Sequence, residues 1–579
     1  MAALCQNGGI QNGLPVLDWS GLVIDDATLN TQDSVTVGKR QWHVYEREWP
    51  QGFHQTLNRT VKTMATFTRK TTKVGNSHHV LDTGFIYARV ICIMASSREM
   101  ISLQTLFSHE LAPHPTALFD DDGNMRDPNK AVLKSKLQIE CGVRSRSHPE
   151  VIILDACAIL WTVSWPAKPS KVSHYIDAVE INIKRRIQNI PVAHIVFDRY
   201  HELSTKSQCR SSRMKGFCRV FQLTEDSPLP SKDIILKVTA NKEQVIKFIV
   251  NRLCLMLVPT GQKIIVTGAD RFPIEIGTGP QQTPVTHEEA DVTMAYHMIQ
   301  EAAKGKSHIK VVSDDTDVLC ILAHHLHERT GGMHQETELT MEACSQGRSA
   351  IDVNEVVKKH ATIMPNLLAA HALTGCDTVS SISRIGKATV LKKLSLYKDI
   401  ICLGDPMMPT DAVILSATKF ISTLYGQKQD ELPLDNLRSI MFQMKIGGKR
   451  HLSPKLSSLP PTNAGFYPHC QRAHYQTILW KSAGSPSPPP LNILHYGWEK
   501  TGSMFQPVKV VPGQLPAPNE VLNLVSCRCT TGCKSALCSC RKFSMSCTGF
   551  CSCNGFECFN PSTPSNDSSD SDEELQEEQ

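Results

Sequence analysis

Four short runs of β-branched and other apolar residues constrain the fold of this chain more than any other feature. The runs are Val151–Leu154, His194–Phe197, Ile264–Thr267 and Ile309–Val312. Amphipathic segments separate them and predict helices over Val172–Gln188, Asn241–Leu257 and Glu288–Lys304. Strands that alternate with helices pair in parallel, and the helices cover the sheet. We therefore expect an α/β domain built on a parallel sheet.

Acidic residues stand where several of these elements end or begin. The set is Asp155, Asp198, Glu289, Asp291, Asp315, Asp317 and Asp377. Sites in open α/β sheets lie at the carboxyl ends of the strands, so these acids are expected to converge on one crevice. For any single acid, a role as a helix or turn cap is the simpler explanation. As an ordered set, they predict a centre for Mg²⁺ or Mn²⁺, the hard ions that carboxylates bind.

The order of these acids resembles the flap endonuclease group of nucleases, within the PIN-like superfamily, over about residues 150 to 395. The matching motifs are Leu154-Asp155-Ala156, Phe197-Asp198, Glu289-Ala290-Asp291, Asp315-Thr316-Asp317, Gly375-Cys376-Asp377 and the turn Arg384-Ile385-Gly386-Lys387. The resemblance implies helices on both faces of the sheet and two Mg²⁺ or Mn²⁺ ions held by the seven acids. The chain departs from the family at Asp291, usually Glu, and at Arg384, usually Gly. About 150 residues also precede Asp155, whereas family members begin near the first strand.

Basic residues that follow the acids are candidates for contact with nucleic acid. Lys206, Arg210 and Arg213 come shortly after Asp198. The resemblance implies a basic helix there that grips the scissile phosphate, with Lys206 and Arg210 in the catalytic role; a solvated basic face is the alternative. The turn also resembles the helix-turn-helix variant that holds duplex backbone through amides at a helix N-terminus. It adds Arg384, Gly386 and Lys387 to the candidates.

Nine cysteines within thirty-two residues form a second distinctive feature, near the C-terminal end. They are Cys527, Cys529, Cys533, Cys538, Cys540, Cys547, Cys551, Cys553 and Cys558. An odd number of cysteines and the absence of a secretion signal favour zinc over a disulfide knot. Nine thiolates serve three tetrahedral Zn²⁺ ions if three sulfurs bridge. Few apolar residues accompany them, so metal binding must supply the folding free energy.

The cysteine segment resembles the tesmin-like CXC domain over about residues 521 to 560, with one repeat where that family commonly has two. The resemblance implies zinc binding and contact with DNA. The basic residues between the cysteines suit phosphate contact. They are Arg528, Lys534, Arg541 and Lys542. A structural zinc staple and a protein-binding module are the alternatives.

Shifts in composition divide the 579 residues into six regions. They are an N-terminal region of unknown role (1–145), the nuclease-like domain (146–400), a helical extension (401–482), a Pro-rich linker (483–520), the cysteine module (521–560) and an acidic tail (561–579). The net charge is +5, and without the seven acids of the tail it is +12, which is typical of a protein that meets polyanions. No apolar run is long enough to cross a bilayer.

Together these features predict a Mg²⁺-dependent endo- or exonuclease that acts on DNA in the nucleus and is targeted by its zinc module. RNA is the alternative substrate. The alternative function is a catalytically inactive, domesticated DNA-binding or chromatin protein that uses the nuclease fold as a scaffold. The oligomeric state does not follow from the sequence.

Overall fold

The computed structural model describes most of the chain between residues 102 and 518. The described ranges there are 102–141, 148–200, 204–206, 219–268, 270–334, 336–345, 347–395, 400, 402–427, 433–446, 455–502 and 504–518, together with residues 39, 43, 71–74 and 77–80 and fifteen positions between 527 and 560. The chain forms two compact units. The first contains Met1–Pro113, Arg438–Thr462 and Gly513–Gln579, and the second contains His114–Leu437 and Asn463–Pro512.

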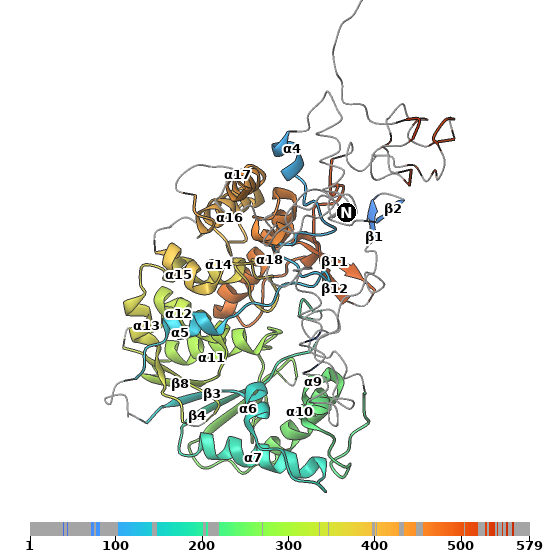
Figure 1. The fold of residues 1–579 in the computed structure, drawn as a ribbon. Coiled ribbons are helices and arrows are strands. Elements are labelled where there is room, and N and C mark those ends of the chain that lie inside the picture. The colour runs from blue at the N-terminus through green and yellow to red at the C-terminus, as the bar shows by residue number, and fades with distance from the viewer. Residues whose placement is uncertain are drawn as a thin grey trace, which may run out of the picture. The chain divides into compact units, whose positions relative to one another are not determined.

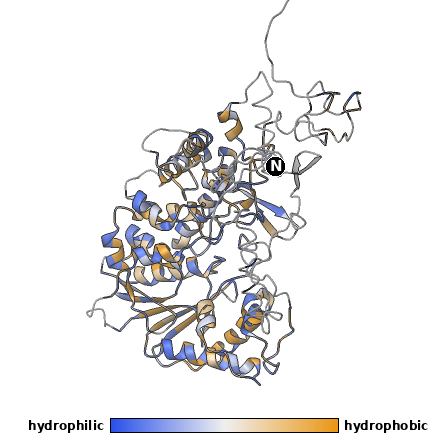
Figure 2. Ribbon diagram, viewed as in Figure 1, coloured by the Kyte–Doolittle hydropathy of each residue, from blue (hydrophilic) through white to orange (hydrophobic). Residues whose placement is uncertain are grey.

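The second unit is built on an eight-stranded sheet of order β10-β9-β8-β3-β4-β5-β6-β7. Its strands are β3 (Val151–Asp155), β4 (Val192–Val196), β5 (Lys263–Thr267), β6 (Ile274–Glu275), β7 (Gly279–Pro280), β8 (His308–Val312), β9 (Glu338–Glu342) and β10 (Ile351–Asp352). The strands β9, β8, β3, β4 and β5 pair in parallel, and the short edge strands are antiparallel. Every residue of β3 is buried, as expected for a strand covered on both faces, and the strands are mainly hydrophobic (orange in Figure 2).

Helices cover both faces of this sheet (Figure 1). The helices of the second unit are α5 (Ala131–Leu137), α6 (Ala156–Thr162), α7 (Val172–Ile187), α9 (Lys232–Lys237), α10 (Thr239–Cys254), α11 (Ala290–Ala303), α12 (Thr316–Glu328), α13 (Val353–Lys359), α14 (Met364–Leu373), α15 (Lys387–Leu394), α16 (Thr410–Leu424) and α18 (Asn463–Lys481). α7 and α10 lie on one face, and α11 and α12 lie on the other. The predicted α/β class, with a parallel sheet between helical layers, is confirmed.

Two segments outside the predicted nuclease-like domain belong to the same unit as its sheet. α5, in the N-terminal region, packs against α12 and α15. α18, in the predicted helical extension, packs against α14 and α12. The predicted Pro-rich linker contains a hairpin of β11 (Trp498–Thr501) and β12 (Met504–Pro507). The guanidinium of Arg472 in α18 donates to the carbonyls of Gly497 and Val508 on either side of this hairpin, at 2.8 and 2.7 Å. Residues from four of the regions that composition separates therefore belong to the second unit.

The first unit has a smaller apolar core. Its elements are β1 (Thr71–Val74), β2 (Ser77–Val80), α4 (Leu103–Phe107) and most of α17 (Leu434–Ile446). The rings of Phe107 and Phe442 lie 4.3 Å apart at the centre of this core. Arg438 is fully buried and donates to the carbonyls of Glu110 and Pro460, which satisfies two of its N–H donors. Among the described helices of the chain, none combines the length and apolar character needed to span a bilayer.

Candidate functional site

The seven predicted acids lie at the carboxyl edge of the parallel strands. Asp155 ends β3, and Asp315 and Asp317 lie just beyond β8, at the start of α12. Asp198 comes two residues after β4, Glu289 and Asp291 lie at the start of α11, and Asp377 follows α14. Coulombic interactions with one another or with a shared lysine connect all seven. Five segments of the chain thus form one carboxylate centre, defined here by these seven residues.

Three members of the carboxylate centre have the spacing of ligands to a single ion. Carboxylate oxygens of Asp291, Asp315 and Asp317 all lie within 4.8 Å of one another. An octahedral ion with bonds of about 2.1 Å places its ligands about 3 to 4 Å apart. The oxygen donors and their spacing therefore fit Mg²⁺ or Mn²⁺.

Burial in the carboxylate centre opposes negative charge. Burial raises the pKa of Asp155 to about 6, and the nearby charge of Asp198 adds to the rise. Burial also raises the pKa of Glu289, Asp291 and Asp315, with like-charged neighbours acting in the same direction. Carboxylates in such surroundings stay ionised when cations lie among them. The centre is therefore electrostatically suited to bind divalent ions.

Two of these acids also cap helices, as the simpler explanation predicted. Asp155 Oδ1 accepts from the Ala158 amide at 2.8 Å at the start of α6, and Oδ2 accepts from Ser313 Oγ at 3.0 Å. Asp315 Oδ1 accepts from the Asp317 amide at 2.8 Å at the start of α12. Each carboxylate oxygen has more than one lone pair, so capping leaves acceptor capacity for a cation. Capping fixes the orientation of the carboxylates without using them up.

Of the three basic residues predicted to contact nucleic acid after Asp198, Lys206 is the one that the structure describes, and it lies in a turn at the edge of the carboxylate centre. Its ammonium is 3.4 Å from Glu289 Oε1 and 3.9 Å from Asp291 Oδ2. Burial lowers the pKa of Lys206, but the charges of Glu289 and Asp291 outweigh it and raise the pKa well above its ordinary value. Arg210 and Arg213 lie outside the described residues. The described basic residue of this segment thus directs its ammonium toward the acids.

Lys130 is a site residue that sequence reasoning missed. Its Nζ lies 2.9 Å from Asp377 Oδ1, 3.1 Å from Asp317 Oδ2 and 3.2 Å from Asp315 Oδ1. The attraction of these three aspartates outweighs burial and raises the pKa of the lysine well above its ordinary value. Nothing in the sequence around Lys130 signals this role, since it stands about twenty residues before the first strand among ordinary polar residues.

A buried chain of polar side chains orients Asp317 from behind. His371 Nε2 donates to Asp317 Oδ1 at 2.8 Å, and the imidazole stacks on the indole of Trp480. Lys387 Nζ lies 2.9 Å from His371 Nδ1 and donates to the Gly375 carbonyl at 2.6 Å. Burial lowers the pKa of His371 to about 4 and that of Lys387 to about 8. These interactions hold Asp317 in place. Burial raises the pKa of its carboxyl, but the charge of Lys130 and the hydrogen bond from His371 outweigh burial and lower the pKa.

The position of Lys387 differs from the sequence prediction. We expected this side chain to contact nucleic acid, but it is 4% exposed and its ammonium points into the unit toward His371. The reason is that Lys387 begins α15 on the side that faces α14, where three carbonyl or hydroxyl oxygens accept from it. A phosphate on the surface is not within reach of an ammonium enclosed in this way.

The turn that contains Arg384 joins α14 to α15, as the helix-turn-helix prediction requires. Gly386 is the N-cap residue of α15 and is exposed. Arg384 is also exposed, and its φ of 65° lies in the left-handed region. This conformation favours glycine, which explains physically why a glycine suits this position. The chain keeps the backbone conformation with an arginine in its place.

Gln476 of α18 is a second missed contributor. Its amide nitrogen donates to Glu289 at 3.4 Å (Oε1) and 3.3 Å (Oε2), and its amide oxygen accepts from Thr378 Oγ1 at 2.6 Å. Gln476 therefore links an acid of the carboxylate centre to the loop that carries Asp377. No sequence signal marks this role, because a buried glutamine on a helix has no characteristic spacing.

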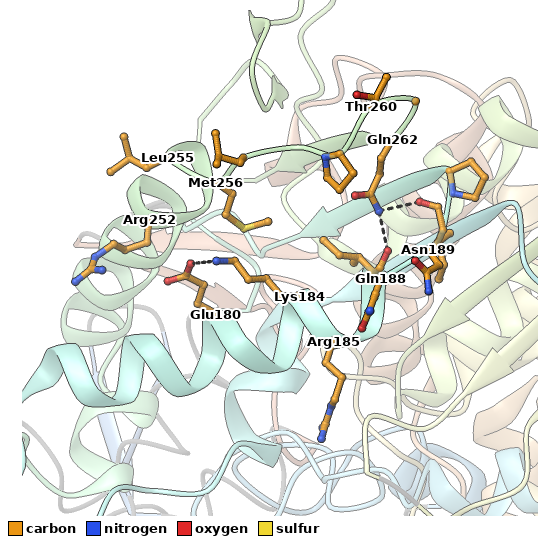
Figure 3. A pocket seen from close by; sticks show the side chains of 16 residues that line it. Glu180, Lys184, Arg185, Gln188, Asn189, Arg252, Leu255, Met256, Thr260 and Gln262 are labelled. Carbon is orange, nitrogen blue, oxygen red and sulfur yellow. Dashed lines mark hydrogen bonds and ion pairs between the residues drawn. The ribbon is translucent and has the colours of Figure 1, made fainter.

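One pocket lies away from the carboxylate centre. It has a volume of about 1120 Å³ and is lined by residues at the ends of α7 and α10, among them Gln188, Asn189, Met256 and Gln262 (Figure 3). Gln262 immediately precedes β5, so this pocket lies at the amino ends of the strands. The carboxylate centre lies at their carboxyl ends and forms a separate site.

The cysteine module is a cluster of free thiols in the part that the structure describes. Its described members are Cys527, Cys529, Cys533, Cys538, Cys547, Cys553 and Cys558, and Cys540 and Cys551 lie outside the described residues. The Sγ atoms of Cys527 and Cys533 are 3.6 Å apart, and those of Cys527 and Cys553 are 3.7 Å apart. A tetrahedron with metal–sulfur bonds of about 2.3 Å has edges of about 3.8 Å. These contacts are too long for disulfides and fit a shared metal.

Two sets of four sulfurs in the module have metal-ligand spacing. One is Cys527, Cys533, Cys547 and Cys553, and the other is Cys527, Cys529, Cys533 and Cys538. Cys527 and Cys533 belong to both sets, which is the arrangement that bridging thiolates produce. The donor set of sulfurs suits Zn²⁺.

Two of the four basic residues predicted to contact DNA in this module are described. Lys534 Nζ lies 3.9 Å above the ring of Phe559. Arg541 donates to the carbonyls of Cys533 and Lys534 at 3.2 and 2.9 Å. Both side chains thus make contacts within the module. Arg528 and Lys542 lie outside the described residues.

Comparisons with known proteins find similarity among solved structures alone. No family model and no curated protein matches the chain. The bacteriophage T5 D15 protein crystallised with metal ions aligns at 11% identity and a TM-score of 0.30, over 57% of this chain and 90% of its own. The catalytic core of Rad2 in complex with a DNA substrate aligns at 13% identity and a TM-score of 0.30, over 52% of this chain and 75% of its own. A complex of the D15 flap endonuclease with DNA and metal ions aligns at 11% identity and a TM-score of 0.28.

Proposed function

We propose that the second unit is a nuclease that hydrolyses phosphodiester bonds in DNA with the help of Mg²⁺ or Mn²⁺. The observation that carries the proposal is the carboxylate centre itself: five segments bring seven acids to the carboxyl edge of a parallel sheet, and three of them are spaced to hold one ion. Burial disfavours the ionised form of several of these acids, so the folded protein gains by binding divalent cations there. The order of the acid motifs, which resembles that of flap endonucleases, supports the same chemistry.

In this proposal the acids bind the metal ions, and the basic residues neutralise the charge of the phosphate. Two divalent ions, when bound, supply activation of the attacking water and stabilisation of the leaving oxygen. Asp155, Asp315 and Asp317 hold fixed orientations through their hydrogen bonds, so little reorganisation is needed when they bind cations. Lys206, already at the edge of the carboxylate centre, pairs with a non-bridging oxygen of the phosphate. Arg210 serves the same phosphate, and Arg213, Arg384 and the amide end of α15 at Gly386 hold the strand beside it.

The proposal assigns the cysteine module to targeting. Nine thiolates bind three Zn²⁺ ions in a CXC-type cluster, and the metal-bound module contacts DNA through the backbone phosphates. Sulfur contacts of tetrahedral length and two ligand sets that share Cys527 and Cys533 support a cluster with bridging thiolates. We place the protein in the nucleus on the basis of its proposed substrate, and imaging of the tagged full-length chain tests that location.

The deciding experiment compares two neighbouring aspartates. Asp315 belongs to the carboxylate centre, whereas Asp314 pairs with the exposed Arg348 at 3.3 Å and accepts from the Cys344 amide at 3.2 Å. The full-length protein is incubated with labelled single-stranded, duplex and flapped DNA, and with matching RNA, in Mg²⁺ or Mn²⁺. We expect Asp315→Asn to lose at least about 100-fold in cleavage rate, since catalytic electrostatics of this kind contribute that much, and Asp314→Asn to stay within about threefold of the wild type.

The other outcomes have definite meanings. Cleavage that survives Asp315→Asn, Asp155→Ala and Asp291→Asn comes from a contaminant and rejects the proposal. DNA binding without cleavage of any substrate supports the alternative, a binding protein that uses the fold as a scaffold. Faster cleavage of RNA than of every DNA substrate reassigns the substrate while keeping the chemistry.

Salt dependence tests the role of the cysteine module. If it binds phosphates, its zinc-dependent affinity for DNA falls steeply as ionic strength rises, because bound phosphates release counterions. We expect the slope to decrease when Lys534 is replaced by Met. A flat response to salt rejects DNA as the ligand and favours a protein partner.

A further inference from the structure

Lys130 contacts three acids of the carboxylate centre at once. Its ammonium lies between 2.9 and 3.2 Å from oxygens of Asp315, Asp317 and Asp377. Two of these acids, Asp315 and Asp317, also belong to the set of three whose spacing fits a single ion. Lys130 and a divalent ion would therefore use two of the same carboxylates.

The segment that carries Lys130 is held firmly on both sides. The Lys130 carbonyl accepts from Thr316 Oγ1 at 3.3 Å, which ties it to the start of α12. Just before it, the Arg126 and Asp127 carbonyls accept from the amide and the hydroxyl of Ser381, at 2.9 and 3.0 Å. Ser381 follows the loop of Asp377. The backbone around Lys130 is therefore fastened to two of the segments that bear its aspartate partners.

The side chain of Lys130 is also largely shielded from water. The side chain of Lys130 is 17% exposed, so little water screens its charge from the aspartates. Its short helix α5 starts at the next residue and packs against α12 and α15, which holds Lys130 beside the start of α12. A fixed positive charge that close repels any cation that binds the same oxygens.

We propose that Lys130 is a built-in counter-cation that competes with a divalent ion for Asp315, Asp317 and Asp377. The inference deepens the proposed function and rests on it. Lys130 neutralises these acids when ions are scarce and opposes the binding of a second ion, so the two ions of the centre bind with unequal affinity. A lysine from the region ahead of the first strand thereby sets the metal concentration at which the centre fills.

The test is a titration of the full-length, zinc-loaded protein with Mn²⁺, which prefers oxygen ligands to the cysteine sulfurs. Free Mn²⁺ is counted by electron paramagnetic resonance, and heats are measured by calorimetry. Wild type should bind one ion tightly and a second weakly. Lys130→Met keeps the length of the side chain and removes its charge, so the weak site should tighten by at least about tenfold.

There are two matched controls, one at Lys134 on the same segment and one at Lys130 itself. Lys134 stands one turn further along α5, and its ammonium donates to the Asp314 carbonyl at 2.9 Å instead of to the carboxylate centre. Lys134→Met removes the same charge and should leave both affinities within about threefold of the wild type. Lys130→Arg retains the charge and should titrate like the wild type. Circular dichroism verifies that each variant is folded, and Lys130→Gln replaces Lys130→Met if the latter is not.

The outcomes separate this inference from the proposed function. Identical Mn²⁺ affinities in the wild type and Lys130→Met overturn the inference, and cleavage by both proteins would show that the nuclease proposal survives. Equal tightening in Lys130→Met and Lys134→Met also overturns it, because the effect would then reflect net charge. Tightening without cleavage upholds the competition and rejects the nuclease. Absence of Mn²⁺ binding in every protein overturns both.

Discussion

The carboxylate centre and the cysteine module are both suited to bind metal ions, but they are assembled in opposite ways. The nine cysteines fall within thirty-two consecutive residues, so the chain brings them together over short distances. The seven acids come from five segments between Asp155 and Asp377, and Lys130 and Gln476 join them from outside that range. The cysteine module depends on spacing within a short stretch of the sequence, whereas the carboxylate centre exists once the sheet and its helices have formed.

The energetic roles of the metals should differ accordingly. Buried apolar side chains of β3, β4, α7 and α10 form the core beneath the carboxylate centre. In the described part of the cysteine module, the buried cluster consists of cysteines. Metal binding therefore completes a site on an already folded unit in one case and supplies the folding free energy in the other.

Removal of zinc should have the largest effect, because it tests directly whether metal supplies the folding free energy of one site and not of the other. We expect a zinc chelator to unfold residues 521–560 almost completely, since zinc binding contributes on the order of 10 kcal/mol to folding in small zinc modules. Residues 151–395 should keep their protection, because their core is apolar. Hydrogen exchange measured peptide by peptide on the full-length protein checks both statements, and metal analysis before chelation should give three zinc ions.

Two results would contradict this contrast. Unchanged exchange in residues 521–560 after complete loss of zinc would mean that the module folds without metal. Loss of protection in β3 and β4 on chelation would mean that zinc supports the second unit as well. A chelator without affinity for zinc serves as the control.

Protonation of the carboxylate centre should have a second, smaller effect on stability. Burial raises the pKa of Asp155 from 3.8 to about 6, so the folded state holds a proton that the unfolded state releases between these values. The stability that this proton gives is complete below pH 4 and is lost as the pH rises through 6, and a shift of about two units corresponds to about 3 kcal/mol. Without Mg²⁺ or Mn²⁺, the contribution of Asp155 to the stability of the second unit should therefore be smaller at pH 7.5 than at pH 5.

Asp155→Asn tests this assignment by urea unfolding in zinc-replete buffer. At pH 7.5 without Mg²⁺ or Mn²⁺, the variant should exceed the wild type in stability, and the two should converge near pH 4. With saturating Mn²⁺ the order should reverse, because the variant loses a ligand. Asp314→Asn, at a half-buried position beside the centre, should follow the wild type in all three conditions. A wild-type advantage at pH 7.5 without divalent ions would disprove the assignment.

The smallest expected effect is a difference in stability between variants of the turn after Asp377. Arg384 has a φ of 65°, which costs a residue with a side chain about 1 kcal/mol relative to glycine. Arg384→Gly should therefore be more stable than Arg384→Ala by about that amount in urea unfolding. Both variants lack the charge, so both should weaken DNA binding to the same extent and leave zinc content unchanged. Equal stabilities would show that the turn has no such strain in solution.

Much of the fold was predictable because its signals are local. The four apolar runs became β3, β4, β5 and β8, and the three predicted helices became α7, α10 and α11 with ends shifted by up to three residues. Alternation of strands and helices also predicted the parallel pairing. The short strands β6, β7 and β10 have two residues each, too few for a recognisable pattern. The hairpin of β11 and β12 falls in a segment whose prolines predicted a linker.

The sequence by itself determined the order of the acids, their places at strand and helix ends, and the spacing of the cysteines. These features depend on neighbours within a few residues, so they are visible before folding. Tertiary structure alone decided that Lys130 neutralises three of the acids, that Gln476 braces Glu289, and that Lys387 turns inward to His371. The physical reason is that a lysine or glutamine has no local preference that marks its partner, and its partners become neighbours when distant segments pack together.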